Sequence, residues 1–174
     1  MGRGANLLLN VPPDRRGMIN EKDSAALIGF KKLRDESFRN NLAKLGSGYF
    51  IPHNGSRPAP NLNDGKKETF EYTGIYVSSI GIELKEPRKI NCIVLNEYLN
   101  NGQHCRNFQL LLMNKKHELI KEIHGTTIGR ERIVTFSTVE ISIIGLYAPN
   151  NYAGAWTAIS EIAAYLINQN LIEK

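Results

Sequence analysis

Residues 107–113 read NFQLLLM, and the alternation in this stretch decides the fold. Phe108, Leu110 and Leu112 share one face of an extended strand, because successive side chains of a strand point to opposite sides. Gln109 falls on the other face. A strand with one apolar and one polar face covers a core on one side only. We therefore expect a half-buried strand of an antiparallel sheet here.

Similar short apolar runs, separated by turn residues, follow one another from about residue 75 onward. No helical pattern intervenes, so the runs predict a mainly β fold, an antiparallel β-sandwich or barrel over residues 75–174. Residues 87, 100–102, 114, 125, 129 and 149–151 supply the Pro, Asn and Gly punctuation between the runs. The runs are YVSSIGIEL, KINCIVLNEYL, HELIKEI, RIVTFSTV, EISIIGLY and AISEIAAYLI.

The chain opens with a different pattern. Residues 5–11 (ANLLLNV) form an apolar run between Gly4 and two prolines, which predicts a buried strand. Residues 12–17 (PPDRRG) predict a turn, because Asp14 can bond forward to the backbone and Gly17 tolerates positive φ.

A helix is predicted over residues 21–45. Asn20 is the expected N-cap, and Glu21 and Asp23 place carboxylates in the first turn, where they suit the helix dipole. Gly46 fits the C-terminal stop, and a break near residues 35–37 is left open. The apolar stripe at helical spacing comprises Ala26, Phe30, Leu33, Phe38, Leu42 and Leu45.

Residues 46–74 are rich in Gly, Pro, Asn and Ser, which favours a loop or linker. The expected organisation is therefore a strand-turn-helix lead over 1–46, a linker and connecting loop over 47–74, and a β-sandwich over 75–174.

Composition narrows the classes of function. The net charge of +5 is mild, and 17 acidic residues dilute the 22 basic ones, so nucleic acid is not an expected partner. No apolar run has the length of a membrane span, and no leader pattern opens the chain. Cys92 and Cys105 do not form a metal motif; they could pair once, but buried free thiols are favoured.

Five stretches resemble glycoside hydrolase family 29 α-L-fucosidases in their order along the chain. They are GRGANLLLNVPPDRRGMINEKD (2–23), NLNDGKKETF (61–70), INCIVLNEYLNNGQHCRNFQLLL (90–112), HGTTIGRERIVTF (124–136) and AISEIAAY (158–165). The first resembles the end of the catalytic barrel, G-x-NLLLN-x-x-P. The others resemble a discoidin-like domain of the coagulation factor 5/8 C type.

The chain departs from the family pattern at three places. Phe70 stands where the family has Trp, Gly102-Gln103-His104 replaces GQR, and Thr157-Ala158 precede ISEI where the family has Pro-x.

The resemblance implies a jelly-roll β-sandwich preceded by a strand-turn-helix remnant of a (β/α)₈ barrel. It also implies that the two carboxylates of a retaining glycosidase lie upstream of this stretch. We therefore predict that the chain alone is not a catalyst. The same resemblance implies an exported setting, in the periplasm or outside the cell.

Carbohydrate binding is the remaining functional expectation. Sugar sites combine an aromatic platform with planar polar side chains. Two questions stay open: Trp156 and Tyr147 could instead plug the base of the sandwich, and Glu97 could bond a neighbouring loop instead of a sugar. The candidate residues lie in three loops: Tyr98, Gln103, His104 and Arg106 in the first; Arg130, with Arg132, in the second; and Asn150, Tyr152 and Trp156, with Asn151 and Tyr147, in the third.

No cofactor is expected. A structural calcium ion near Asn61, Asn63 and Asp64 is the alternative considered, although this stretch offers few carboxylates.

The sequence leaves three candidate functions for this chain. The first is the non-catalytic C-terminal region of an α-L-fucosidase, which supports the barrel and contacts fucosylated glycan or another carbohydrate. The second is a free-standing lectin-like or adhesion module. The third, a binder of anionic polymers, is disfavoured by the charge balance. The first hypothesis predicts an exposed apolar face on residues 5–45.

Overall fold

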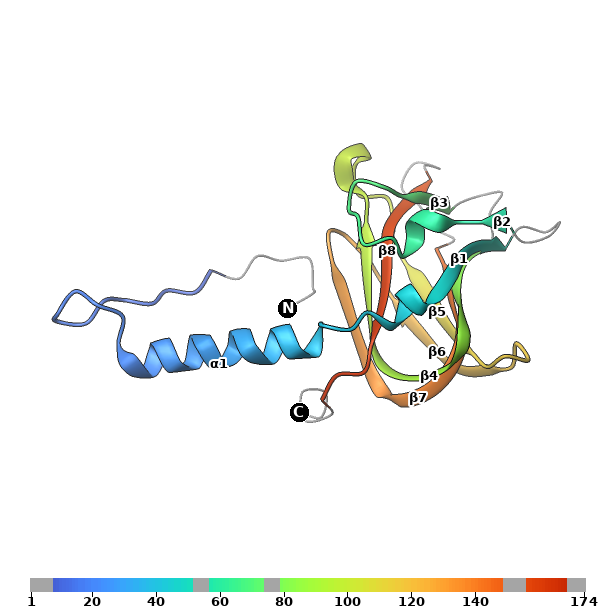
Figure 1. Cartoon of the computed structure of the whole chain (residues 1–174). Coiled ribbons are helices and arrows are strands. Elements are labelled where there is room, and N and C mark those ends of the chain that lie inside the picture. The colour runs from blue at the N-terminus through green and yellow to red at the C-terminus, as the bar shows by residue number, and fades with distance from the viewer. Residues whose placement is uncertain (1–7, 52–56, 74–78, 149–155, 169–174) are drawn as a thin grey trace.

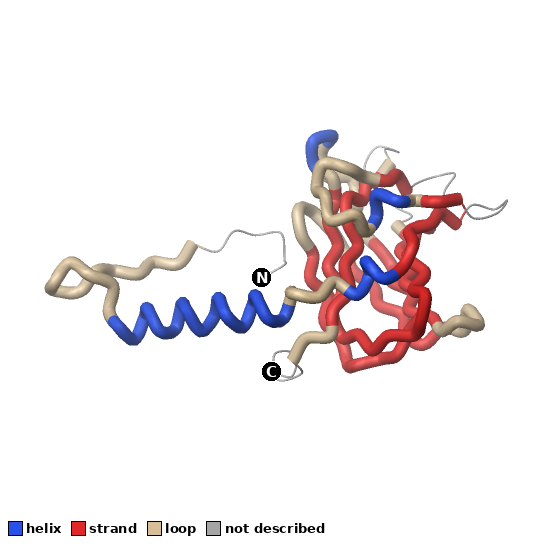
Figure 2. The backbone as a smooth tube through the Cα atoms, viewed as in Figure 1, coloured by secondary structure: helices blue, strands red, loops and turns tan. Residues whose placement is uncertain are grey.

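The computed structural model describes residues 8–51, 57–73, 79–148 and 156–168. An N-terminal arm carrying one long helix projects from a body made almost entirely of strands (Figures 1 and 2). The elements are α1 (Glu21–Ser37), η1 (Leu42–Leu45), β1 (Gly46–Ile51), β2 (Arg57–Pro58), η2 (Pro60–Leu62), β3 (Glu71–Thr73), β4 (Ser79–Glu97), η3 (Leu99–Asn101), β5 (Phe108–Met113), β6 (Leu119–Gly125), β7 (Arg132–Tyr147) and β8 (Thr157–Tyr165).

The strands form the expected antiparallel β-sandwich. Their order is β2-β1-β4-β7-β5-β6, and β8 pairs with β4 on one edge and with β3 on the other. β4 and β7 pair along three stretches separated by two register shifts, at residues 80–83, 88–90 and 92–95 of β4. Each of these two long strands therefore passes from one layer of the sandwich into the other.

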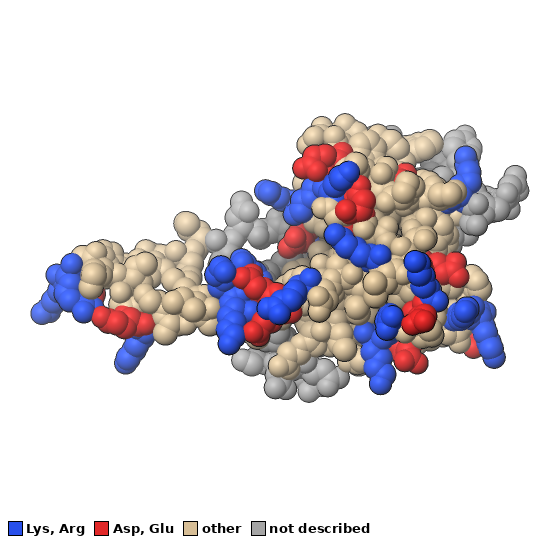
Figure 3. All heavy atoms as spheres, in the orientation of Figure 1, with Lys and Arg blue, Asp and Glu red and all other residues tan. Residues whose placement is uncertain are grey.

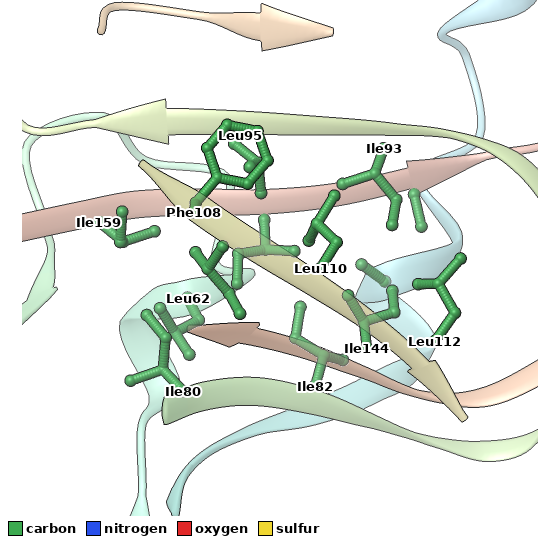
Figure 4. Close-up of a cluster of buried hydrophobic side chains, with 14 of the residues drawn as sticks. Leu62, Ile80, Ile82, Ile93, Leu95, Phe108, Leu110, Leu112, Ile144 and Ile159 are labelled. Atoms are coloured by element: carbon green, nitrogen blue, oxygen red, sulfur yellow. The ribbon is translucent and has the colours of Figure 1, made fainter. Parts of the chain in front are cut away.

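The alternation at β5 is confirmed. Phe108, Leu110 and Leu112 are fully or almost fully buried, while Gln109 and Leu111 are half-buried. They meet residues from both layers in one continuous core (Figure 4). Burial of this apolar area is the main stabilising contribution to the sandwich.

Each of the two long strands joins two runs that were expected as separate strands. The described parts of the runs before and after Pro87 both belong to β4, and the runs RIVTFSTV and EISIIGLY both belong to β7. Pro87 is tolerated inside β4 because the ladder between β4 and β7 is interrupted between residues 83 and 88.

The described part of residues 47–74, expected as a linker, belongs largely to the sandwich. β1 pairs with β2 and β4, and Ala59 and Leu62 are fully buried in the core. The glycines that suggested a loop are required by close packing: a Cβ at Gly46 would meet the Glu83 carbonyl oxygen, and one at Gly48 that of Ala59.

The helix ends earlier than expected. Asn20 is the N-cap as predicted, since its side chain accepts a hydrogen bond from the Lys22 amide. α1 stops at Ser37, within the stretch where a break was left open, and Gly46 instead follows the short helix η1.

The strand expected over residues 5–11 is wrong for its described part. Residues 8–11 belong to no strand and pair with no strand among the described residues, and residues 5–7 lie outside the described chain. The turn that follows is confirmed: the Asp14 carboxylate accepts hydrogen bonds from the amides of Arg16 and Met18, and Gly17 has a φ of 76°.

Candidate functional site

An aromatic cluster lies at one end of the sandwich, beside β3 and the loop that follows β4. The Phe70 ring stacks on Tyr98 with centroids 4.3 Å apart, and Tyr72 meets Phe70 edge-on at 5.0 Å. Trp156 extends the cluster, with its ring 5.7 Å from that of Tyr72. Tyr72 and Trp156 are 37% and 42% exposed, so the outer half of this cluster is open to solvent.

Side-chain amides frame the tyrosines. Asn100 donates a hydrogen bond to the Tyr98 hydroxyl at 3.0 Å, and Asn101 donates one to the Tyr72 hydroxyl at 3.2 Å. Both amides come from η3, which stands at the end of the sandwich (Figure 1). The cluster therefore presents apolar ring faces next to fixed polar groups, which is the combination that a sugar ring contacts.

A cavity of about 460 Å³ opens beside Tyr98. Its volume falls within the range usual for small-molecule sites, and its lining is mixed in polarity. Lys67, Glu68 and Arg130 bring charge, and none of them has a salt-bridge partner among the described residues. The lining comprises Lys67, Glu68, Asn96, Glu97, Tyr98, Leu99, Asn100, Arg130 and Ser160.

Glu97 bonds the neighbouring loops. Its Oε1 accepts hydrogen bonds from the amides of His104 and Cys105, and its Oε2 accepts one from the Gly129 amide. The residue is 3% exposed. Of the two roles left open by the sequence, the loop-bonding role is therefore the one that its hydrogen bonds satisfy.

The structure brings part of the predicted set together. Tyr98 and Arg130 line the same cavity, and Trp156 joins Tyr98 through the rings of Tyr72 and Phe70. Trp156 is too exposed to plug the base of the sandwich.

The remaining predicted residues do not line this cavity or lie outside the described chain. Gln103 is exposed beside the Gly129 turn, and His104 is half-buried and contributes its backbone amide to Glu97. Arg106 is exposed and Arg132 half-buried, neither among the cavity-lining residues. Asn150, Asn151 and Tyr152 lie outside the described residues.

Sequence reasoning missed Phe70 and Tyr72. Both lie in the stretch interpreted as a linker, and their spacing of two residues places them on one face of an extended segment. That alternation, F-x-Y directly before a buried Thr73, is the signal that could have identified them.

The cysteines are buried free thiols, as favoured by the sequence. Burial raises the pKa of both Cys92 and Cys105 to about 12, and the Glu97 carboxylate adds to this at Cys105. A raised pKa leaves both as unreactive thiols at neutral pH.

One buried carboxylate departs from its ordinary pKa. Burial raises the pKa of Glu161 to about 7, although its Oε2 accepts a hydrogen bond from the Gly65 amide at 2.9 Å. Its Oε1 accepts one from the Asn41 side chain, so Glu161 ties the segment after α1 to β8.

The calcium alternative stays a prediction. Asn61 and Asn63 direct their Nδ2 atoms at backbone carbonyls, and Asp64 accepts hydrogen bonds from the Lys66 amide and the Thr69 hydroxyl. Within the described part of the chain, no three His, Cys, Asp or Glu side chains gather as a metal cluster would.

The arm carries the predicted exposed apolar face. None of the side chains of α1 is buried, and Phe30 is 48% exposed. At its base, Phe38 meets Tyr165 edge-on at 5.1 Å, and a cavity of about 250 Å³ separates the helix from the sheet. The cavity is lined by Phe30, Leu33, Arg34, Ser37, Phe38, Ile133 and Ile167.

Charge is mixed on the visible face of the molecule. Lys and Arg alternate with Asp and Glu over both the arm and the sandwich (Figure 3). Among the described helices, none combines the length and apolar character needed to cross a membrane.

The fold and the exposed end-on cluster together define a discoidin-like β-sandwich joined to a helical arm. The sequence of the chain is similar to those of two plant proteins named as α-L-fucosidases. The chain is 28% identical over 149 residues to alpha-L-fucosidase 1 of Arabidopsis thaliana, an alignment that covers 80% of this chain and 29% of the relative. No family model matches the chain.

Solved structures agree. A GH29 fucosidase of Ruminococcus gnavus in complex with fucose is 26% identical, with a TM-score of 0.81 over 98% of this chain and 35% of its own. A family 32 CBM of C. perfringens NanJ, solved in complex with galactose, shares the fold alone, at 19% identity and a TM-score of 0.57 over 71% of this chain. The chain therefore corresponds to about a third of the length of its GH29 relatives.

Proposed function

We propose that this chain acts as the non-catalytic C-terminal region of an α-L-fucosidase, in which the β-sandwich supports a catalytic barrel. The observation that carries the proposal is the uncovered apolar stripe of α1. A stripe at helical spacing normally buries itself against a partner. The GH29 relatives contain this region and about twice as much additional chain, which supplies such a partner. An exported location is part of the same proposal.

The test uses the polypeptide encoded immediately upstream of this stretch in the genome. Expressed with the chain, it is expected to form a stoichiometric complex or a continuous protein that hydrolyses p-nitrophenyl α-L-fucoside. The double variant Phe30→Ser/Leu33→Ser should weaken the complex, whereas Leu119→Ser, an equally exposed apolar site on β6, should not. An upstream frame unrelated to a glycosidase would refute the proposal.

Carbohydrate contact by the sandwich is the second function that we propose. It rests on the Phe70, Tyr72, Tyr98 and Trp156 cluster beside the cavity with Asn100 and Arg130. The ring faces suit the apolar side of a pyranose, and the amide and guanidinium groups suit its hydroxyls. A free-standing lectin-like module would use the same site without a catalytic partner.

Amide-resolved NMR during addition of L-fucose, galactose and lactose tests this second function. Saturable shifts should localise to residues 67–72, 96–101, 130 and 156. Trp156→Ala should raise the dissociation constant about tenfold, which corresponds to a loss of about 1.4 kcal/mol of binding free energy. Ile120→Ala, an exposed residue on β6 away from η3, is the matched control. Absence of shifts at tens of millimolar sugar would exclude the site.

A further inference from the structure

Residues 96–98, at the end of β4 and directly after it, contact the Arg130 turn and β8, both of which line the cavity. Asn96 donates a hydrogen bond from Nδ2 to the Arg130 carbonyl at 2.6 Å. Tyr98 donates its amide to the Ala158 carbonyl, two residues from Trp156. Glu97 lies between these two residues and is the only one of the three that carries a charge.

Glu97 joins two loops that are distant in sequence. Oε1 is 2.7 Å from the His104 nitrogen and 2.9 Å from the Cys105 nitrogen, and Oε2 is 3.1 Å from the Gly129 nitrogen. A backbone hydrogen bond joins the same two residues, since the Glu97 amide donates to the Gly129 carbonyl oxygen at 3.0 Å. The loop after η3 and the turn that presents Arg130 are thus held on one carboxylate.

We propose that Glu97 is a positioning residue for carbohydrate binding, which acts on the sugar through the two loops that it holds in place. The inference rests on the second proposed function. Three backbone amides occupy three of the roughly four acceptor sites of the carboxylate, so most of its hydrogen-bonding capacity is directed at the loops. Hydrogen bonds from amides to a buried charged acceptor are stronger than neutral ones, which suits an anchor for two irregular segments.

Glu97→Gln is the discriminating variant, because it keeps the size of the side chain and replaces one accepting oxygen with a donor. The Gln amide group cannot accept a hydrogen bond at that nitrogen, so at least one of the three amides loses its partner. We expect the dissociation constant for L-fucose or galactose to rise about tenfold. Amide exchange at His104, Cys105 or Gly129 should accelerate, while exchange in β5 stays slow.

Asn91→Ala is the matched control. Asn91 is also fully buried on β4 and makes two backbone hydrogen bonds, both to Ile167, away from the cavity. This variant should lower the unfolding temperature and leave the dissociation constant unchanged. If Glu97→Gln does not fold, Glu97→Asp, which keeps the charge on a shorter side chain, takes its place with the same expectations.

The outcomes separate the two claims. Unchanged sugar affinity in Glu97→Gln, with the wild-type chain binding, overturns the positioning role and leaves carbohydrate binding intact. If the wild-type chain binds none of the sugars, carbohydrate binding and the positioning role that rests on it are both refuted. Weakened binding in both Glu97→Gln and Asn91→Ala would indicate a general loss of stability and also overturn the proposal.

Discussion

The arm and the sandwich use apolar residues in opposite ways. α1 has Phe30 and Leu33 on one stripe, yet buries none of its side chains, whereas β5 buries Phe108, Leu110 and Leu112 almost completely. Both segments place apolar residues at the spacing of their secondary structure, although α1 also exposes Ile28 outside its stripe. The difference is that β5 finds both layers of the sandwich around it, while α1 extends away from the body (Figure 1). Periodicity therefore predicts which face will be buried, and the available partners decide whether it is.

The largest effect should come from the sandwich core. Phe108→Ala removes a ring that is 1% exposed at the centre of the core, and the cavity left behind should lower the free energy of unfolding by about 3–5 kcal/mol. Urea denaturation followed by tryptophan fluorescence measures the loss. A change below about 1 kcal/mol would show that the core is not packed around this ring.

A smaller effect, dependent on pH, is expected at the joint between arm and sandwich. Because the pKa of Glu161 is raised to about 7 in the folded chain, the folded state holds a proton that the unfolded state releases near 4.5. The contribution of the protonated Glu161 side chain to the free energy of unfolding is therefore complete below pH 4.5, and it is lost as the pH rises through 7.

Glu161→Gln should remove this pH dependence. Between pH 4.5 and pH 8, the wild type should lose about 1–3 kcal/mol of unfolding free energy relative to the variant, because only the wild type has to release this proton. Thermal unfolding at a series of pH values tests this. Parallel pH profiles for the two proteins would contradict the raised pKa.

A still smaller effect is expected at the start of the arm. Asn20→Ala removes the side-chain acceptor for the Lys22 amide and should destabilise α1 by about 1 kcal/mol. Because the helix is not part of the core, its amide exchange should accelerate while the unfolding midpoint of the sandwich stays constant. Asn20→Ser, which can still cap, is the control.

The smallest effect should follow substitution of the arm stripe. Phe30→Ser with Leu33→Ser should change the free energy of unfolding of the isolated chain by less than about 0.5 kcal/mol, because neither side chain is buried. It should instead reduce self-association in sedimentation velocity. A stability loss comparable to that of Phe108→Ala would mean that the arm folds back onto the body.

Features of the fold that depend on nearby residues could be predicted from the sequence, and features that depend on distant residues could not. Alternation predicted β5, and capping chemistry predicted Asn20, because both depend on neighbours within a few positions. β1 was missed because its glycines are required by backbone carbonyl groups that a local pattern does not place, those of Glu83 in β4 and of Ala59 beyond β2.

The site was predicted only in part for the same reason. Tyr98 and Arg130 stood out as loop residues with suitable chemistry. The F-x-Y alternation places Phe70 and Tyr72 on one face, but their place in the site is set by the pairing of β3 with β8, which brings Tyr72 to η3 and Trp156. That strand pairing spans more than eighty residues, so the local pattern does not show which loops the two rings will meet.

The pairing of β8 also has a consequence for biosynthesis. β8 begins at Thr157 and lies between β3 and β4, so the earlier strands cannot complete their layer until this segment has left the ribosome. Contacts of such long sequence separation are typical of slow folding. Until β8 has been made, the apolar arm and the unfinished sheet are exposed together, and exposed apolar surface with unpaired strand edges favours aggregation.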